Sequence, residues 1–379
     1  MDKNLHKTLI DFRHEIHKHP DVSGEEKETA ERIKKYFEQF NPDEIVENIG
    51  TYGLAVIFDS NKPGPVTMYR SELDALPIGE VNTFDYTSVY EGKGHKCGHD
   101  GHMVMVAGLA ALLNENPPKK GKVILMYQPE EETGTGAVKM LKDKKFRDLK
   151  PDYMFSLHNL PGVELGEVRC KPGVFASASV GMIVRMKGKT SHAAEPENGN
   201  SPALAMASLV QEMECLTQKL TLKDFSLVTT IHARLGEVAF GTTPGYAEVM
   251  ATLRAYRNED LDKLKSAAEQ KVKDITKPRQ LVGEIEWVEE FSSTVNQNES
   301  VEVIKQAAKE NELKYTDMQQ PYRWSEDFGY FLQEYPGAMF GLGSGANQPQ
   351  LHNPDYDFPD DLIPKGTGMF FSVIKQYNF

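Results

Sequence analysis

The sequence predicts an α/β protein in which a mainly parallel-sheet domain contains a second, α+β domain as an insertion. Apolar strands alternate with helices, as in parallel sheets covered on both faces. Near Ser179 this alternation gives way to a strand–helix–strand–strand–helix order. The length of 379 residues also exceeds what one hydrophobic core usually serves. We therefore expect one domain from residues 1–180 and 292–379, and an inserted domain from 181–291.

Charge and cysteine usage narrow the possible partners and the compartment. The net charge of −13 argues against nucleic acid and anionic membranes as partners. The three cysteines, Cys97, Cys170 and Cys215, are scattered and suggest no disulfide framework, which indicates a reducing compartment. The N-terminus shows no apolar core of a signal peptide, and no apolar run has transmembrane length. We expect a cytoplasmic protein with a small-molecule substrate.

The first domain is predicted from helical and strand-like apolar runs. Two helices are expected at 5–19 and 27–40, the second opened by a capping box from Ser23 to Glu26. Short β-branched or aromatic runs predict strands, at residues 54–58, 66–69, 122–127 and 153–157. The apolar run 103–113 predicts a buried helix.

The inserted domain is predicted from a different order of elements. Strands are expected at 180–186, 228–235, 247–256 and 285–288, and helices at 201–216 and 260–275. This order resembles a split βαβ, or ferredoxin-like, arrangement.

The most informative stretch is 94–102, which holds a thiol, three imidazoles, a carboxylate and three glycines. Cys97 and His99 are two residues apart, so both side chains can point the same way. A thiolate beside an imidazole suits zinc, and also manganese, cobalt or nickel. Asp100 could accept a ring N–H and fix the tautomer of a ligand. One alternative is a polar loop entering a helix, with Asp100 as N-cap. A structural zinc site is the other, but it needs a second Cys/His pair, which the sequence lacks.

Further acidic and histidine residues follow predicted strands, where ligands bind in open α/β sheets. The candidate ligands are Cys97, His99, one glutamate of 130–132, His158 and His352. Five protein ligands exceed what one tetrahedral ion accepts, so we expect two divalent ions. Of the neighbouring Glu131 and Glu132, one can bind metal while the other takes a proton. The three glutamates by themselves could equally form a solvated acidic turn.

Several motifs together carry a resemblance to a known family. They begin at the ends of the first predicted strands and continue to the C-terminal region, in this order: Glu72-Leu73-Asp74-Ala75-Leu76-Pro77, His95-Lys96-Cys97-Gly98-His99-Asp100-Gly101-His102, Gln128-Pro129-Glu130-Glu131-Glu132, His158-Asn159-Leu160-Pro161-Gly162, Gly188-Lys189-Thr190-Ser191-His192-Ala193-Ala194, Ser325-Glu326-Asp327-Phe328 and Leu351-His352-Asn353-Pro354. The sequence resembles the M20 metallopeptidase family. More narrowly, it resembles the amidohydrolase subfamily of hippurate hydrolases, indole-acetyl-amino-acid hydrolases and N-acetyl-diaminopimelate deacetylases.

The resemblance implies a fold and a set of roles. The fold would be a catalytic domain of the phosphorylase/hydrolase-like zinc-exopeptidase type with an inserted lid or dimerisation domain. The implied metal ligands are Cys97, His99, Glu132, His158 and His352. Glu131 would be the general base, Asp74 would orient a ligand, and His192 would stabilise the oxyanion, often across the interface of a homodimer.

This sequence departs from the family pattern at three places. Arg70-Ser71-Glu72 replaces Arg-Ala-Asp, and Glu130 replaces an alanine before the two catalytic glutamates. In the inserted domain, Gly241-Thr242-Thr243-Pro244 replaces Asn-x-Ile-Pro, so an amide that helps to bind substrate is missing. Arg254 could instead clamp a substrate carboxylate, or it could be an ordinary surface charge.

The sequence thus predicts a metal-dependent hydrolase that cleaves the amide bond of small N-acyl amino acids. A dipeptidase or aminopeptidase of the same family is the alternative among enzymes, and it would need an acidic partner for a free amino terminus. A non-catalytic metal-binding relative would lack the base, whereas Glu131 is present.

Overall fold

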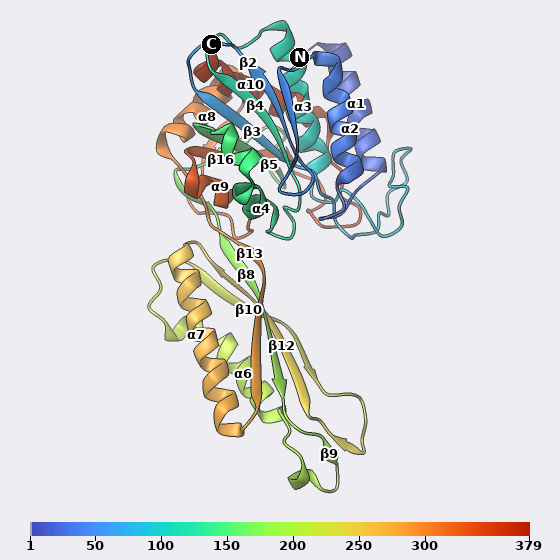
Figure 1. Cartoon of the computed structure of the whole chain (residues 1–379), viewed down its shortest axis with the longest axis vertical. Helices are drawn as coiled ribbons and strands as arrows, with labels where there is room; N and C mark the ends of the chain where they lie inside the picture. The colour runs from blue at the N-terminus through green and yellow to red at the C-terminus, as the bar shows by residue number, and fades with distance from the viewer. Residues whose placement is uncertain (1) are drawn as a thin grey trace. The chain divides into compact units, whose positions relative to one another are not determined.

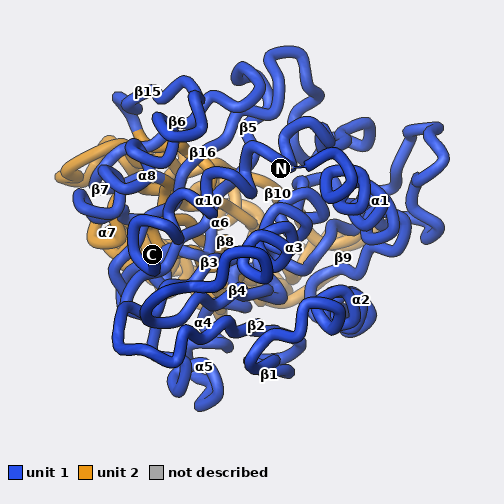
Figure 2. The backbone as a smooth tube through the Cα atoms, turned by 90° about the horizontal axis from the view of Figure 1, so that it is seen from above, with its two compact units in different colours: residues 1–175, 294–320, 326–379 blue, residues 176–293, 321–325 orange. Residues whose placement is uncertain are grey.

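The computed structural model describes residues 2–379 and divides into two compact units. Unit 1 consists of the chain up to residue 175 together with 294–320 and 326–379, and unit 2 of 176–293 and 321–325 (Figure 2). Among residues 2–379, no helix has both the length and the apolar character that a membrane span requires.

Unit 1 is built on an eight-stranded sheet (Figure 1). In spatial order its strands are β1 (Glu44–Ile49), β2 (Gly53–Asp59), β4 (Lys122–Gln128), β3 (Val66–Glu72), β5 (Tyr153–Pro161), β16 (Gly337–Gly345), β6 (Val168–Cys170) and β15 (Tyr315–Asp317). The central run β4-β3-β5-β16 is parallel, whereas β1 and β2 form an antiparallel edge. The prediction of a mixed α/β fold with a mainly parallel sheet is confirmed.

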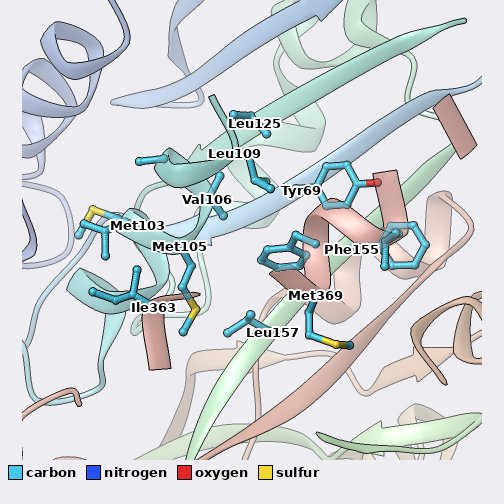
Figure 3. Close-up of a cluster of buried hydrophobic side chains, with 14 of the residues drawn as sticks. Tyr69, Met103, Met105, Val106, Leu109, Leu125, Phe155, Leu157, Ile363 and Met369 are labelled. Carbon is cyan, nitrogen blue, oxygen red and sulfur yellow. The ribbon is translucent and has the colours of Figure 1, made fainter. Parts of the chain in front are cut away.

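Both faces of the sheet are buried along β2, β4, β3, β5 and β16, whose residues are buried at consecutive positions. In β2, Leu54, Val56 and Phe58 belong to the main core, and the intervening Ala55 and Ile57 are buried on the opposite face. The helices of unit 1 are α1 (Lys3–Lys18), α2 (Lys27–Phe37), α3 (His99–Glu115), α4 (Gly136–Lys142), α5 (Lys144–Leu149), α8 (Asn298–Glu310), α9 (Phe328–Glu334) and α10 (Ile363–Asn378). Side chains of α3, α10 and the sheet interlock in the main core (Figure 3).

The start of α2 differs from the predicted capping box. The first turn is satisfied by Asp21, whose Oδ2 accepts the backbone N–H of Thr29 at 2.8 Å. The Ser23 hydroxyl instead donates to Oδ2 of Asp74 at 2.7 Å, and Glu26 is the residue before the helix. The prediction was wrong because Ser23 has a partner far along the chain that local spacing does not reveal.

Unit 2 contains a four-stranded antiparallel sheet and two long helices. Its main elements in chain order are β8 (Ala178–Lys187), α6 (Ala203–Glu214), β10 (Ser226–Leu235), β12 (Tyr246–Ala255), α7 (Asn258–Thr276) and β13 (Val282–Phe291). The strands lie in the order β10-β12-β8-β13. Along β12, every second side chain from Ala247 to Ala255 is buried in a core shared with α6 and α7. The short strands β9 (Ser191–His192) and β11 (Thr242–Thr243) pair separately.

Unit 2 also includes residues 321–325, which the sequence assigned to the other domain. The backbone N–H of Ser177 donates to the carbonyl of Trp324 at 3.1 Å, and its hydroxyl donates to the carbonyl of Tyr322 at 2.7 Å. The Arg254 guanidinium donates to the carbonyl of Arg323 at 3.1 Å. These bonds join segments distant in sequence, so a pattern read along the chain does not show them.

Candidate metal centre

The centre begins at the turn into α3, which starts at His99, four residues earlier than predicted. The residue before it, Gly98, has a φ of +93°, and a Cβ added there would lie 2.7 Å from Oδ1 of Asn159. Only glycine accepts this conformation and this contact without strain. The turn therefore places Cys97 just before the helix and His99 in its first turn.

Several sets of potential metal ligands overlap around this turn. In each set the ligand atoms all lie within 4.8 Å of one another, and the sets include Cys97–His99–His158, Cys97–Glu132–His352, His99–Glu131–Glu132 and Glu72–His99–His102. His158 belongs to β5, while the glutamates follow β4. The structure thus brings together all five residues expected to bind metal, and the expected base beside them.

Glu132 links the histidines of this cluster. Its Oε1 lies 3.9 Å from Nε2 of His99 and 3.6 Å from Nε2 of His352. On the other side, Sγ of Cys97 lies 3.5 Å from Nε2 of His158. Thiolate, imidazole and carboxylate donors at these separations match the chemistry of zinc and related divalent ions.

The second ring nitrogen of two histidines is bound by a backbone carbonyl. Nδ1 of His99 lies 2.9 Å from the carbonyl oxygen of Asp74, and Nδ1 of His158 lies 2.9 Å from that of Asn159. A carbonyl only accepts, so each Nδ1 carries a proton, and in the neutral ring the lone pair is therefore on Nε2. Nε2 of His99 and Oε1 of Glu132 are buried without a hydrogen-bond partner. These atoms fit the role of metal ligands.

The electrostatics of the cluster also favour a cation. Burial, and then the carboxylate of Glu326, raise the pKa of Glu131 well above its usual range. Burial lowers the pKa of His99, yet nearby carboxylates, led by Glu72, outweigh it and raise the pKa to about 10. Burial and neighbouring carboxylates raise the pKa of the Cys97 thiol. A divalent ion would offset this negative potential and permit the thiolate to form.

Asp74 contacts two of the expected ligands at once. Its backbone carbonyl binds His99, and its Oδ2 accepts the backbone N–H of Glu132 at 2.9 Å together with the Ser23 hydroxyl. The sequence expected Asp74 to orient a ligand but did not identify Ser23 as its partner.

The interpretation of Asp100 as the partner of a ligand histidine is wrong. Its Oδ2 accepts from Nη1 of Arg13 and from Nδ1 of His17, both at 2.8 Å. All three side chains are buried. Asp100 does not cap the helix either, because the cap position belongs to Gly98. Both donors lie on α1, so the spacing around Asp100 carried no signal for them.

A buried charged network behind the cluster was missed by sequence reasoning. Nη2 of Arg70 donates to Glu326 at 2.8 Å and to Asp327 at 2.9 Å, and Nη1 pairs with Glu72. Nδ1 of His102 lies 2.8 Å from Glu72. A buried arginine requires such partners. A signal was available, since Arg70 directly follows the strand-forming run 66–69 and belongs to the same strand, β3.

The remaining two expected residues, His192 and Arg254, belong to unit 2. His192 lies on β9 opposite Thr242, its side chain is exposed, and its Nδ1 accepts the N–H of Ala194 at 3.1 Å. Arg254 makes a second bond to the 321–325 segment, because it also donates to the Ser325 hydroxyl at 3.0 Å. The structure places neither residue in the ligand sets of unit 1.

Comparison with known proteins agrees with this donor set. A sequence model of the peptidase family M20/M25/M40 matches residues 68–376. The chain belongs to this family. The resemblance noted in the sequence is confirmed, and family membership together with the donor set identifies the chain as a metal-dependent hydrolase.

Individual M20 relatives cover nearly the whole chain. The N-acetyl-L-cysteine deacetylase of Bacillus subtilis is 28% identical over 373 residues, covering 98% of this chain and 88% of the relative. The N-acetyldiaminopimelate deacetylase of Lactobacillus helveticus is 29% identical over 374 residues, covering 95% of this chain and 94% of the relative. The crystal structure of the Bacillus subtilis YXEP protein, described as a dinuclear metal binding peptidase of family M20, shares the fold. Its TM-score is 0.82 at 24% identity, with 98% of each chain covered.

Proposed function

We propose that this M20 chain hydrolyses the amide bond of small N-acyl amino acids at a centre of two divalent metal ions in unit 1. The observation that carries the proposal is the set of overlapping ligand triplets. Two atoms of these triplets, Nε2 of His99 and Oε1 of Glu132, are buried without a hydrogen-bond partner. The names of the deacetylases described above support an N-acyl amino acid as the substrate class.

The ions would be zinc, manganese, nickel or cobalt, held by Cys97, His99, Glu132, His158 and His352. Bound there, they would polarise the acyl carbonyl and lower the pKa of the attacking water.

Glu131 is assigned the role of general base. Its carboxylate lies 3.8 Å from Nε2 of His99 and is buried, so it adjoins the ligands without contact to bulk water. It would accept the proton of the attacking water and return it to the leaving amine nitrogen. Asp74 would keep both His99 and the main chain of Glu132 in position during these steps.

Unit 2 is assigned the role of lid and dimerisation domain, corresponding to the segment 181–291 predicted from the sequence, with 1–180 and 292–379 forming the catalytic domain. Its strand–helix–strand–strand–helix–strand order and its strand arrangement β10-β12-β8-β13 support the proposal of a ferredoxin-like lid. Exposed Leu204 on α6 and Ile231 on the edge strand β10 favour association into a homodimer. We place the protein in the cytoplasm.

Two residues of unit 2 would then act on the substrate. His192 would donate a hydrogen bond to the oxyanion, from its own subunit or from the partner. Arg254 would bind the substrate carboxylate.

The test is hydrolysis by metal-free protein to which single metals are returned. The substrates are N-acetyl, N-benzoyl and N-succinyl amino acids beside unblocked dipeptides. We expect turnover of at least one acylated series that requires metal. Dipeptide hydrolysis alone would replace this function with that of a dipeptidase or aminopeptidase, and full metal binding without any turnover would reject a hydrolase.

A further inference from the structure

Glu130 has a backbone conformation that side-chain-bearing residues rarely adopt. Its φ is +56°, in the left-handed region, which costs free energy in any residue other than glycine. It stands between the end of β4 and the two glutamates of the proposed centre. A strained turn at this place needs other contacts to maintain it.

The main chain of Glu130 is held by a carboxylate from another part of unit 1. Its N–H donates to Oε1 of Glu26 at 2.7 Å, and Glu26 is fully buried. Its carbonyl accepts the N–H of Gly136, the first residue of α4, at 3.1 Å. Both polar groups of this peptide segment are therefore fixed.

The side chain of Glu130 is fixed as well. One carboxylate oxygen accepts the Thr51 hydroxyl at 3.0 Å. The other accepts the Thr135 hydroxyl at 2.8 Å and pairs with the ammonium of Lys139. With both oxygens engaged and the side chain buried, Glu130 joins the turn between β1 and β2 to the start of α4.

The two residues that follow Glu130 are those that face the ligand cluster. The carboxylate of Glu131 lies 3.8 Å from Nε2 of His99, and the N–H of Glu132 is bound by Asp74. The chain is thus fixed just before Glu131, by Glu130, and again at Glu132, by Asp74.

We propose that Glu130 is a positioning residue, whose carboxylate anchors the left-handed turn and thereby aims Glu131 and Glu132 at the metal centre. This rests on the proposed function, because it assigns those two residues their roles. Glu130 itself neither binds metal nor transfers a proton, since its oxygens are occupied by Thr51, Thr135 and Lys139.

The test compares three variants with the wild-type protein: Glu130→Ala, Glu130→Gly and Lys139→Met. Two quantities are measured for each, the zinc affinity, by competition with a chromogenic chelator, and kcat. Both Glu130 variants should bind zinc about 10- to 100-fold more weakly, as is typical when the partner of a metal ligand is lost. Lys139→Met should weaken binding in the same direction, and the Glu130→Ala/Lys139→Met double variant should be no weaker than Glu130→Ala alone.

The glycine variant separates the side chain from the backbone. Glycine adopts the left-handed turn without strain, so it removes only the anchors. Wild-type zinc affinity and kcat in Glu130→Gly would overturn the proposal. Asp143→Ala is the matched control, because Asp143 binds the N–H of Gly50, beside Thr51, and caps α5 without contact to the glutamates. Asp143→Ala should lower the unfolding temperature and leave the zinc affinity unchanged. If Asp143→Ala bound zinc as weakly as Glu130→Ala does, the loss of affinity would result from general destabilisation, and the proposal would fail.

These outcomes are separable from failure of the proposed function. If the wild-type protein binds zinc but hydrolyses no N-acyl amino acid, the proposed function fails. The chelator titration then still decides whether Glu130 positions Glu132.

Discussion

Nδ1 of His99 lies 2.9 Å from the backbone carbonyl oxygen of Asp74, while the carboxylate of Asp74 holds the main chain of Glu132. Asp74, two residues after β3, therefore fixes two proposed ligands, one from α3 and one from the segment after β4. Because the carbonyl can only accept, it also fixes the tautomer in which Nε2 of His99 is free to bind metal.

Cys97 should act as a ligand thiolate. Cys97→Ala removes one donor of two ligand sets, so metal content measured on the purified protein and turnover should fall together. Cys170→Ala is the matched control, because Cys170 is also a buried thiol but lies outside the centre. Full metal content in Cys97→Ala would contradict the assignment.

Glu131 should be the base. Glu131→Gln keeps the shape of the side chain but cannot accept a proton. Turnover should therefore fall by roughly 10²- to 10⁴-fold, with metal content unchanged. Steady-state kinetics and metal analysis on the same sample check this. Turnover near the wild-type rate in Glu131→Gln would place the base elsewhere.

His17 should make stability depend on pH. Burial lowers its pKa, but hydrogen bonds to Asp100 and Glu80 outweigh burial and raise the pKa to about 9. The folded state then binds a proton that the unfolded state releases near pH 6.5. This stabilisation is complete below pH 6.5 and is lost as the pH rises through about 9.

Denaturant unfolding between pH 6 and pH 10 measures this contribution. Over that window, the wild-type protein should lose on the order of 3 kcal/mol more unfolding free energy than His17→Gln does. His232→Gln, at an exposed histidine of unit 2, should follow the wild-type curve. Parallel curves for wild type and His17→Gln would show that His17 is not the titrating group.

His192 should contribute to turnover without binding metal. His192→Ala should keep metal content and raise the barrier by about 3 kcal/mol, as expected for one lost oxyanion donor. If the protein is a homodimer that shares sites, mixing His192→Ala with Glu131→Gln dimers should restore activity as subunits exchange. Exchange without recovered activity would place His192 in the site of its own chain.

The sequence predicted those parts of the fold and site that depend on local patterns. The parallel strands follow from continuous apolar runs, and the ligand cluster follows from polar residues at their carboxyl ends, such as Asp74 and His158. Contacts between segments that are distant in sequence could not be predicted, because the spacing of residues along the chain does not show which segments meet. Asp100 was therefore interpreted as the hydrogen-bond partner of a ligand histidine, whereas it pairs with Arg13 and His17. The left-handed turn at Glu130 was equally hidden, since it is maintained by Glu26, Thr51 and Lys139.

Unit 2 is not formed by one continuous stretch of the chain. Residues 321–325 complete it from a second stretch of chain, through the bonds that Ser177 and Arg254 make to that stretch. A fragment cut at 176 and 293 would carry β8 and β12 but lose the acceptors of both residues. Domain exchange between relatives should therefore transfer both stretches together. If 176–293 alone were grafted, the recipient protein would have to supply the hydrogen-bond acceptors of Ser177 and Arg254.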